Sequence, residues 1–442
     1  MTASSSHKVS PTATMKSKYG DRPLQIHGDR PLQIMRHLHV FCLLASLCAF
    51  HRGSAQVLHH FDPRPFRREA LDGRDFEYDA IAFLHRLSFS PMPYLGRRAP
   101  LRENSFAGTV GSTRKDEFYV QMLARAHMEL DGPLFAGYRF RRDEDFDGRF
   151  EQNLIGLGLE QLGVRFSLWG DIVGDKASND VHADLSWEDD GGNQARFTWI
   201  APDAFFNQKS SDAQFEVSPY TYFLQGKRAF TPDIALKGFA QVHPTSQLFE
   251  EKGLTSRNRE WSMALGLELP LSERTCLELY METLRTRRSR IGARPMPQAQ
   301  DFHRRFDSRG FEFRREGEDG QEQWLGYRAL YLTETDRRPF DPLHDADRDR
   351  EEHTLYIGRQ LPINERIDFL PTLFFAYHDV SDFFPENQEV PGQRITGFYG
   401  KFAPAFQVLL HRESGAHMTF NLTTRLHRPA FGGGNIQAVI PF

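Results

Sequence analysis

The segment FYVQMLARAHMEL, residues Phe118–Leu130, alternates between apolar and polar side chains over most of its length. Even positions such as Met122 and Ala124 are apolar, whereas odd positions such as Arg125 and His127 are mostly polar. Successive side chains of a β-strand point to opposite faces of the sheet, so a period of two separates these sets. The segment therefore predicts a strand with one apolar and one polar face.

The same alternation returns later in the chain, at residues 164–168, 181–188, 261–269 and 417–422. Several runs reach about nine to eleven residues, which is the length that a tilted strand needs to cross the hydrocarbon layer. Strands of ordinary globular proteins average about five or six residues. The length of the runs therefore favours strands that span a membrane.

The composition supports a sheet with one apolar face and one face in contact with water. The 442 residues have a mean hydropathy of −0.55 and 26% charged residues, yet 38 of them are phenylalanine. A transmembrane helix needs about twenty consecutive apolar residues, and the longest apolar run, Val40–Phe50, is much shorter. These values exclude a bundle of transmembrane helices.

Polar stretches rich in Asp and Arg separate the alternating runs, and we expect them to be long extracellular loops: residues 141–149, 285–305 and 335–352. Shorter links at residues 131–133 and 270–273 predict periplasmic turns. The runs amount to about sixteen strands, within limits of about fourteen to eighteen, and bacterial single-chain barrels normally have an even number. The predicted fold is all-β, a closed antiparallel transmembrane β-barrel, because an open edge would leave unpaired amides in lipid.

The N-terminal region predicts an exported protein. Residues 35–55 combine a basic start, an apolar stretch and the small residues Gly53-Ser54-Ala55, which is the pattern of a signal peptide cleaved after Ala55. Residues 1–34 contain a tandem repeat of GDRPLQI and are unlike an export signal, so we interpret them as a doubtful upstream extension. Cys48 also permits a lipoprotein reading, but Leu47 is bulkier than the small residue that such sites usually carry.

Residues 56–112 differ from the alternating part of the chain. They are rich in Arg and Pro, which interrupt long regular elements, and we interpret them as a periplasmic lead-in or a plug segment. The barrel itself is predicted to occupy residues 113–442. If residues 56–112 remain in the periplasm, they are the part of the chain that would dock on an envelope complex.

Charge and cysteine content narrow the partners further. Residues 1–55 hold seven Lys/Arg and two Asp/Glu, so the remainder carries 48 basic and 57 acidic residues and a net charge near −9. This balance does not favour a nucleic-acid partner. Beyond residue 55 the chain has one cysteine, Cys276, so an internal disulfide or a cysteine metal site cannot form there.

The last strand carries the sharpest motif. Ile436, Ala438, Ile440 and Phe442 alternate with other residues, and the given chain ends on Phe442. This pattern resembles the terminal signature of the Gram-negative outer-membrane β-barrel superfamily, which includes porins. Pro441 departs from the pattern, because proline cannot donate a ladder hydrogen bond.

The resemblance covers about residues 113–442 in architecture and the last seven residues in motif, and it indicates no subfamily. It implies an outer-membrane location, contact with outer-membrane lipid and lipopolysaccharide, and recognition of the terminal segment by the barrel-assembly machinery.

Candidate catalytic and metal-binding clusters are weak. His411, Ser414 and His417 are close in sequence, but they flank Gly415 in a predicted tight turn and have no evident orienting acid. The acidic run 143–147 could bind Ca²⁺, yet neighbouring arginines favour a solvated loop. His59-His60 has no further ligand at useful spacing. We predict no catalytic residues, no metal site and no cofactor.

Arginine and acidic residues inside the predicted strands are the most informative feature. About ten of the 55 basic residues are lysine, and the rest are arginine. An arginine facing lipid near the midplane would cost about 2–4 kcal/mol, so we expect the charged strand residues to face the lumen. The candidates for lining the lumen are Arg125, Glu129, Arg139, Arg165, Asp171, Asp184, Arg196, Glu268, Glu278, Arg328 and Arg425.

The function that these observations favour is a passive pore or export channel for hydrophilic, charged solutes. A lumen packed shut by salt bridges is the main alternative for the interior. A non-conducting accessory barrel that anchors an envelope complex is the alternative function, and a barrel-borne hydrolase is a less favoured third.

Overall fold

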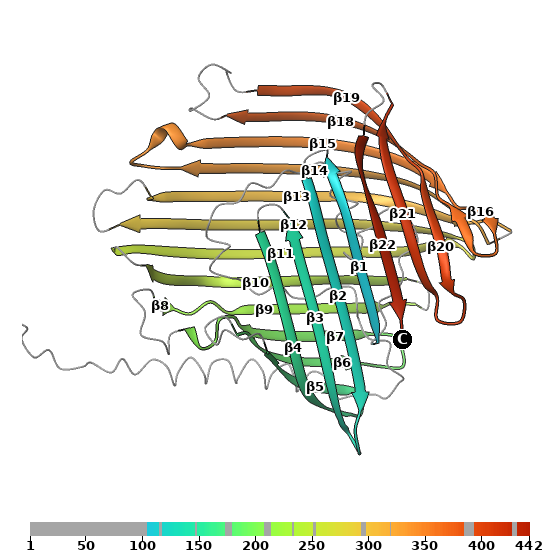
Figure 1. Cartoon of the computed structure of the whole chain (residues 1–442), viewed down its shortest axis with the longest axis horizontal. Helices are drawn as coiled ribbons and strands as arrows, with labels where there is room; N and C mark the ends of the chain where they lie inside the picture. The colour runs from blue at the N-terminus through green and yellow to red at the C-terminus, as the bar shows by residue number, and fades with distance from the viewer. Residues whose placement is uncertain are drawn as a thin grey trace, which may run out of the picture. The chain divides into compact units, whose positions relative to one another are not determined.

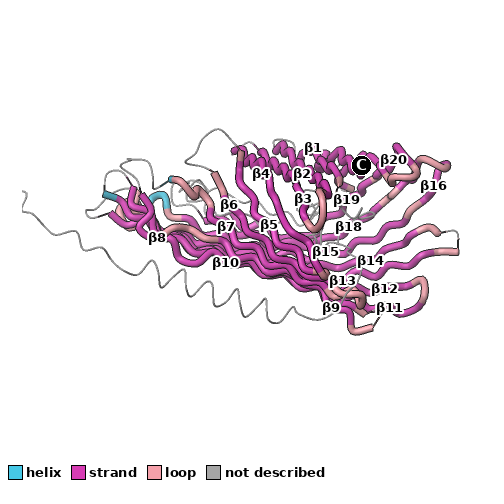
Figure 2. Tube along the Cα trace, turned by 90° about the horizontal axis from the view of Figure 1, so that it is seen from below, coloured by secondary structure: helices cyan, strands magenta, loops and turns pink. Residues whose placement is uncertain are grey.

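The structure is a computed structural model that describes residues 104–442 except for several short stretches. The stretches outside the description are 115–116, 146–147, 173–178, 207–213, 232–233, 251–252, 293–297, 319, 384–392 and 427–430. The predicted extension, the signal peptide and the lead-in segment up to residue 103 also lie outside the described residues. Figure 2 shows strand along nearly all of the described chain.

The described chain consists almost entirely of strands. In chain order they are β1 (Ser105–Arg114), β2 (Glu117–Glu129), β3 (Leu134–Asp145), β4 (Gly148–Gln161), β5 (Val164–Asp171), β6 (Val181–Glu188), β7 (Gln194–Ala201), β8 (Gln214–Val217), β9 (Thr221–Ala229), β10 (Ala235–Glu250), β11 (Leu254–Ser272), β12 (Thr275–Gly292), β13 (Gln300–Glu316), β14 (Glu322–Arg337), β15 (Ala346–Arg359), β16 (Leu361–Asn364), β17 (Ile367–Phe369), β18 (Thr372–Phe383), β19 (Gln393–Ala403), β20 (Ala405–His411), β21 (Ala416–Arg425) and β22 (Phe431–Pro441). A short 3₁₀ helix, η5 (Pro342–His344), lies between β14 and β15. Among the described residues, none of the helices has the length and apolar character that crossing a membrane requires.

The strands form one antiparallel sheet that closes on itself. β1 pairs with β2 on one side and with β22 on the other, so that Thr109 lies opposite both Gln121 and Gln437. In Figure 1 the first strand, in blue, lies between β2 and the red β22. Closure removes the sheet edges, so ladder amides find partners without water. The predicted closed antiparallel barrel is confirmed.

The barrel wall has 18 strands, because several of the 22 segments share one position in the wall. β8 and β9 both pair with β10, and β15 leads directly into β16. Pro371 separates β17 from β18, and Pro404 separates β19 from β20. Proline lacks the N–H that a ladder bond needs, which accounts for these two interruptions.

The predicted number of about sixteen strands is therefore too low, although 18 lies at the upper limit of the predicted range. One missing strand is β1, which begins at Ser105, whereas the barrel was predicted to begin at residue 113. The glycines and hydroxyl residues of the sequence SFAGTVGSTR give a weak apolar pattern. The pairing with β2 and β22 nevertheless makes this segment a full part of the wall.

Both ends of the described barrel chain lie at the same end of the barrel. Ser105 is paired with Pro441, and the Phe442 N–H donates to the Asn104 carbonyl at 3.0 Å. The connections at this end are short, as at residues 130–133 and 273–274. The first agrees with the turn predicted at 131–133, whereas β11 continues to Ser272, so the turn predicted at 270–273 lies at 273–274 instead. Longer connections lie at the opposite end, and outer-membrane barrels place short turns in the periplasm and longer loops outside.

The predicted long loops are shorter than expected. Strands β3, β4, β12, β13, β14 and β15 cover most of residues 141–149, 285–305 and 335–352. A strand ladder is made by backbone N–H and C=O groups, so a charged stretch can extend a hairpin as well as an apolar one. The interpretation of these stretches as loops was wrong for this reason.

The two faces of the wall are the reverse of those in a soluble protein. Charged side chains such as Arg328, Asp184 and Glu278 are 0%, 4% and 1% exposed. Large apolar side chains such as Leu157 and Phe375 are 64% and 51% exposed. A barrel with a polar inner face and an apolar outer face suits a hydrocarbon surrounding.

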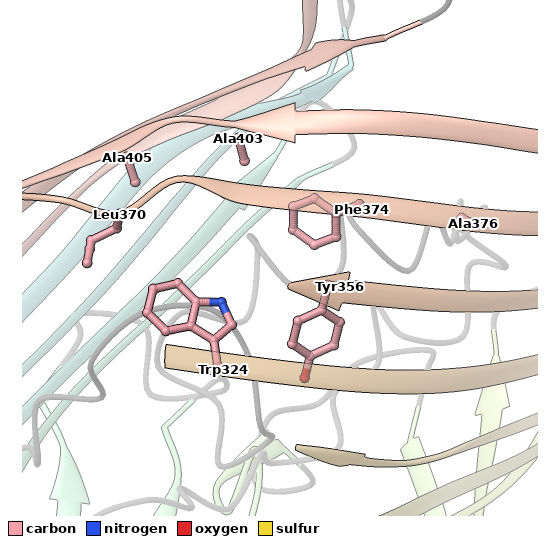
Figure 3. Packing of buried hydrophobic residues seen from close by; sticks show 7 residues of the cluster. All are labelled: Trp324, Tyr356, Leu370, Phe374, Ala376, Ala403 and Ala405. Carbon is pink, nitrogen blue, oxygen red and sulfur yellow. The ribbon is translucent and has the colours of Figure 1, made fainter. Parts of the chain in front are cut away.

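Aromatic rings also pack on the inner face, over glycines of neighbouring strands. Figure 3 shows Trp324 on β14, Tyr356 on β15 and Phe374 on β18 side by side. A Cβ at Gly358 would lie 2.5 Å from the Trp324 ring, and one at Gly326 would collide with Tyr356. Each strand of this pair thus leaves space for the ring of the other, and the cluster fixes their register.

Candidate functional site

A carboxylate on β6 joins two arginines from other strands. Asp184 Oδ2 lies 2.6 Å from Arg139 Nη1 of β3 and 3.0 Å from Arg196 Nη2 of β7. Thr198 donates its hydroxyl to Asp184 Oδ1 at 2.5 Å. Because β4 and β5 separate β3 from β6 in the sheet, these side chains can meet only on the concave, inner face of the wall.

An aromatic ring supports this ion-paired cluster. The Arg139 guanidinium lies 3.7 Å from the centroid of Trp169 on β5, within the range of a cation–π interaction. Trp169 lies across Gly156 and Gly137, where an added Cβ would approach the indole to 2.5 Å or less. Two small residues on β4 and β3 therefore let the ring reach Arg139.

Three glutamates form a row around the short-turn end of the inner face. Glu268 on β11 lies opposite Glu278 on β12, and Glu278 lies opposite Glu312 on β13. Like charges directly opposite each other destabilise a sheet, so the row needs compensating cations. Lys237 Nζ lies 2.5 Å from Glu268 and 3.0 Å from Glu278, whereas Arg314 lies 2.6 Å from Glu278 and 2.9 Å from Glu312.

The row continues into the aromatic cluster. Tyr356 donates its hydroxyl to Glu312 Oε2 at 2.9 Å, and β14 lies between the two strands. Two cations among three carboxylates leave the row with one more negative than positive charge.

A second charged row lies closer to the long-connection end. Arg304 on β13, Glu334 on β14 and Arg348 on β15 are directly opposite one another. Arg304 Nε pairs with Glu334, and Arg348 Nη1 lies 3.6 Å from the same carboxylate. All three are buried. The row continues from Arg304 through Thr286 to Glu260, which accepts from the Thr286 hydroxyl at 2.9 Å, and from Arg348 to Asp382 of β18, so acidic and basic residues alternate along it.

The structure brings together part of the predicted lumen set. Arg139, Asp184 and Arg196 form one cluster, and Glu268 and Glu278 belong to the glutamate row. Arg328 is buried and donates to Ser308 Oγ at 2.8 Å.

The other predicted residues have different surroundings, although Arg125 lies directly opposite Arg139 of the first cluster. Asp171 accepts from the Asn153 N–H at 3.3 Å, and Arg165 pairs with Glu160 across the β4–β5 hairpin. Arg125 lines a small recess that Arg139 also borders. Glu129 and Arg425 are exposed at the ends of β2 and β21.

Sequence reasoning missed all three residues of the second row. Arg304 and Arg348 fall inside stretches that were predicted to be loops, and Glu334 immediately precedes one of them. Their period-two spacing with Phe302, Leu332 and Arg350 was the available signal. Glu312 was also missed, although it alternates with Phe311 and Phe313 on β13.

The chain resembles outer-membrane β-barrel channels. OmpT of Vibrio cholerae is 8% identical with a TM-score of 0.39, and the match covers 78% of this chain and 100% of that chain. OccK2 of Pseudomonas aeruginosa is 11% identical with a TM-score of 0.40, over 76% and 96% of the two chains. No family model and no curated protein matches the sequence. The likeness is distant and is confined to the barrel.

The terminal strand presents its alternating side chains outward. Ile436, Ile440 and Phe442 are 49%, 38% and 69% exposed, and β22 pairs with both β1 and β21. Ala438 lies opposite Gly108 of β1 and opposite Met418 of β21. Recognition of these residues by the assembly machinery stays a prediction.

The predicted turn joins β20 and β21 at residues 412–415; Ser414 lies in it, whereas His411 ends β20 and His417 is a buried residue of β21. His411 Nδ1 lies 3.0 Å from Ser414 Oγ; His411 is exposed and Ser414 is half-buried. His417 contacts the Gly415 carbonyl instead, at 2.9 Å. The hydrogen bonds of Ser414 and His411 close the turn at residues 412–415.

Proposed function

We propose that this barrel is a passive pore or export channel that carries hydrophilic, charged solutes across the outer membrane. The observation that supports it best is the inner face, where ion-paired Arg, Lys, Asp and Glu side chains lie beside the aromatic clusters. Polar groups of this kind are stable in a membrane protein when they face water or one another.

The strand number agrees with a water-filled interior. Barrel diameter grows with the number of strands, and barrels of 16–18 strands leave an aqueous channel where smaller barrels are filled by their own side chains. This barrel has 18 strands. The glutamate row would then select cations at the short-turn end.

Planar lipid bilayers provide the test. We expect the purified full chain to insert with stepwise ion conductance. Glu268 is the most exposed member of the glutamate row, at 33% of its side chain. Glu268→Gln should shift the reversal potential in a salt gradient toward anions, because one lumen charge is removed.

The matched control is Glu273→Gln, an exposed acid in the turn that follows β11. It removes the same charge from the barrel rim and should leave the reversal potential nearly unchanged. Absence of conductance from correctly folded protein would overturn the pore. Equal shifts in both variants would overturn the assignment of selectivity to the glutamate row.

We also propose that residues 35–55 direct export and are removed after Ala55. The support is the sequence pattern of a basic start, an apolar stretch and Gly53-Ser54-Ala55. N-terminal sequencing of protein from the membrane fraction should give Gln56 as the first residue. Retention of Met35 or of residues before it would contradict this proposal.

A further inference from the structure

The outer face of β11 changes abruptly from apolar to basic. From the short-turn end, its outward residues are Leu271, Leu269, Leu267, Leu265, Met263, Trp261, Arg259 and Arg257. Ten residues separate Leu271 from Trp261, which is about 33 Å along a strand. At a strand tilt of about 40° this corresponds to about 25 Å of height, the expected thickness of the apolar band.

This spacing places Trp261 at the membrane–water interface and Arg259 just beyond it. Aromatic residues gather at that interface in outer-membrane barrels. β11 begins at Leu254 at the long-connection end, so the basic residues lie at the level of the headgroups on that side. The Trp261 ring is itself covered by Arg285 of β12, whose guanidinium lies 5.7 Å from the ring centroid.

Two of the arginines at this level form a pair of like charges. Arg259 and Arg287 of β12 lie directly opposite each other, and both are exposed. Within the described residues, no salt bridge joins either of them to a carboxylate. Directly opposed like charges destabilise a sheet, so an anion bound between the two guanidinium groups would remove a repulsion.

The neighbouring row adds further positive charge. Arg285 and Arg305 of β13 are also directly opposite, and both contact Asp307 at 2.8 Å. One carboxylate therefore balances one of these two arginines. Together with Arg259 and Arg287, the basic patch carries four arginines against one aspartate.

We propose that this basic patch, Arg259, Arg285, Arg287 and Arg305, binds the phosphate groups of lipid headgroups in the membrane leaflet at the long-connection end. Guanidinium groups match phosphate oxygens with paired, charge-assisted hydrogen bonds. The patch continues directly from the apolar band, so a lipid can place its chains on Leu265 and Met263 and its phosphate on Arg259 and Arg287. The proposal does not depend on whether the barrel conducts.

At the headgroup level the outer face is not equally charged on all strands, so the basic patch is confined to one part of the barrel. In the same rows β15 presents Asp347 and Asp349 in place of arginine. A nonspecific attraction of the whole rim to anionic lipid would not distinguish these strands. We therefore expect lipid phosphate to gather along β11, β12 and β13.

The test measures which lipids contact the barrel. The full chain is reconstituted in phosphatidylcholine vesicles containing spin-labelled phosphatidic acid or spin-labelled phosphatidylcholine, and electron paramagnetic resonance gives the motionally restricted fraction of each. We expect the protein to prefer phosphatidic acid over phosphatidylcholine. This preference should fall about tenfold in the double variant Arg259→Gln, Arg287→Gln, since each arginine near the membrane surface adds to the attraction for anionic lipid. Removal of the repulsion should leave the double variant folded.

The control variant, Arg274→Gln with Arg412→Gln, removes two exposed charges from turns at the opposite end. It should retain the preference. Loss in both variants, or in neither, would overturn the proposal. If the double variant changes the oligomeric state in sedimentation but not the lipid preference, the patch is a contact with a second copy, and the lipid assignment is wrong.

Discussion

Asp184 balances the charge of two arginines on the inner face. Its side chain is 6% exposed and touches Arg139, Arg196 and Thr198. A buried carboxylate with three partners is stable only while the set is complete, because each remaining charge would otherwise stay desolvated. The stability of this part of the wall therefore depends on one residue.

We expect Asp184→Asn to lower the free energy of unfolding by about 3 kcal/mol, since two guanidinium groups would lose their shared carboxylate. Urea unfolding in detergent micelles, followed by tryptophan fluorescence, measures the change. Asp190→Asn, in the exposed β6–β7 turn, is the control and should change stability by about 0.5 kcal/mol or less. A similar loss in both variants would contradict the role of the ion-paired cluster.

Neighbouring residues of β2 should respond in opposite ways to substitution. Ala124 lies opposite Phe106 of β1 and Phe140 of β3 on the outer face, whereas Arg125 lies opposite Arg139, which pairs with Asp184 on the inner face. Ala124→Arg would place a guanidinium in hydrocarbon at a cost of about 2–4 kcal/mol. Arg125→Ala adds no polar group to the lipid face and should fold nearly as well as the parent chain.

The shift of gel mobility on heating compares the folded fraction of the two β2 variants. If Arg125→Ala is the variant that prevents folding, the assignment of the two faces is wrong. This contrast follows from the two-residue period, which forces adjacent side chains into opposite surroundings.

At the scale of elements, the fit between β5 and its neighbours rests on two glycines. Trp169 lies over Gly156 and Gly137, and this contact brings its ring to Arg139. A side chain at either glycine would push the indole toward the barrel interior. The position of β5 and the geometry of the charged cluster are therefore linked.

We expect Gly156→Ala to lower the free energy of unfolding by about 1–3 kcal/mol, as overpacking usually does. The near-ultraviolet circular dichroism of Trp169 should change with it, because the ring leaves the guanidinium. Gly170→Ala is the matched control, since a Cβ there meets nothing within 4 Å. An unchanged spectrum in Gly156→Ala would show that Trp169 does not depend on the glycine.

At the scale of the whole molecule, the decisive contact joins the first and last strands. Thr109 of β1 lies opposite Gln437 of β22, and Thr419 of β21 is next in the same row. Residues opposite one another in an antiparallel pair have Cα atoms about 5 Å apart, within reach of a disulfide. Residues two strands apart are about 10 Å apart, which is too far.

In a chain without its native cysteines, Thr109→Cys with Gln437→Cys should form a disulfide on mild oxidation, whereas Thr109→Cys with Thr419→Cys should not. The cross-linked chain becomes a large covalent ring, which migrates differently in a denaturing gel without reductant. Absence of the cross-link in the first variant, or equal cross-linking in both, would contradict closure between β1 and β22.

The sequence by itself determined the class of fold and the faces of the clearest strands. The order of side chains along a strand predicts the two faces at residues 118–130 and the outward Ile436, Ile440 and Phe442. Because the period is two, only one orientation of the strand places all its apolar side chains against lipid. The predicted signal peptide and lead-in segment stay predictions, since they lie outside the described residues.

Only the tertiary structure decided how many strands close the wall and which charges meet. Arg139 and Asp184 lie on strands separated by two others, and Lys237 reaches Glu278 across β11. Such distances depend on the curvature of the closed sheet and on the register between its strands. The sequence of a single strand specifies neither. For the same reason, the ion pairs of Glu312 and Arg304 could not be predicted from the residues next to them in sequence.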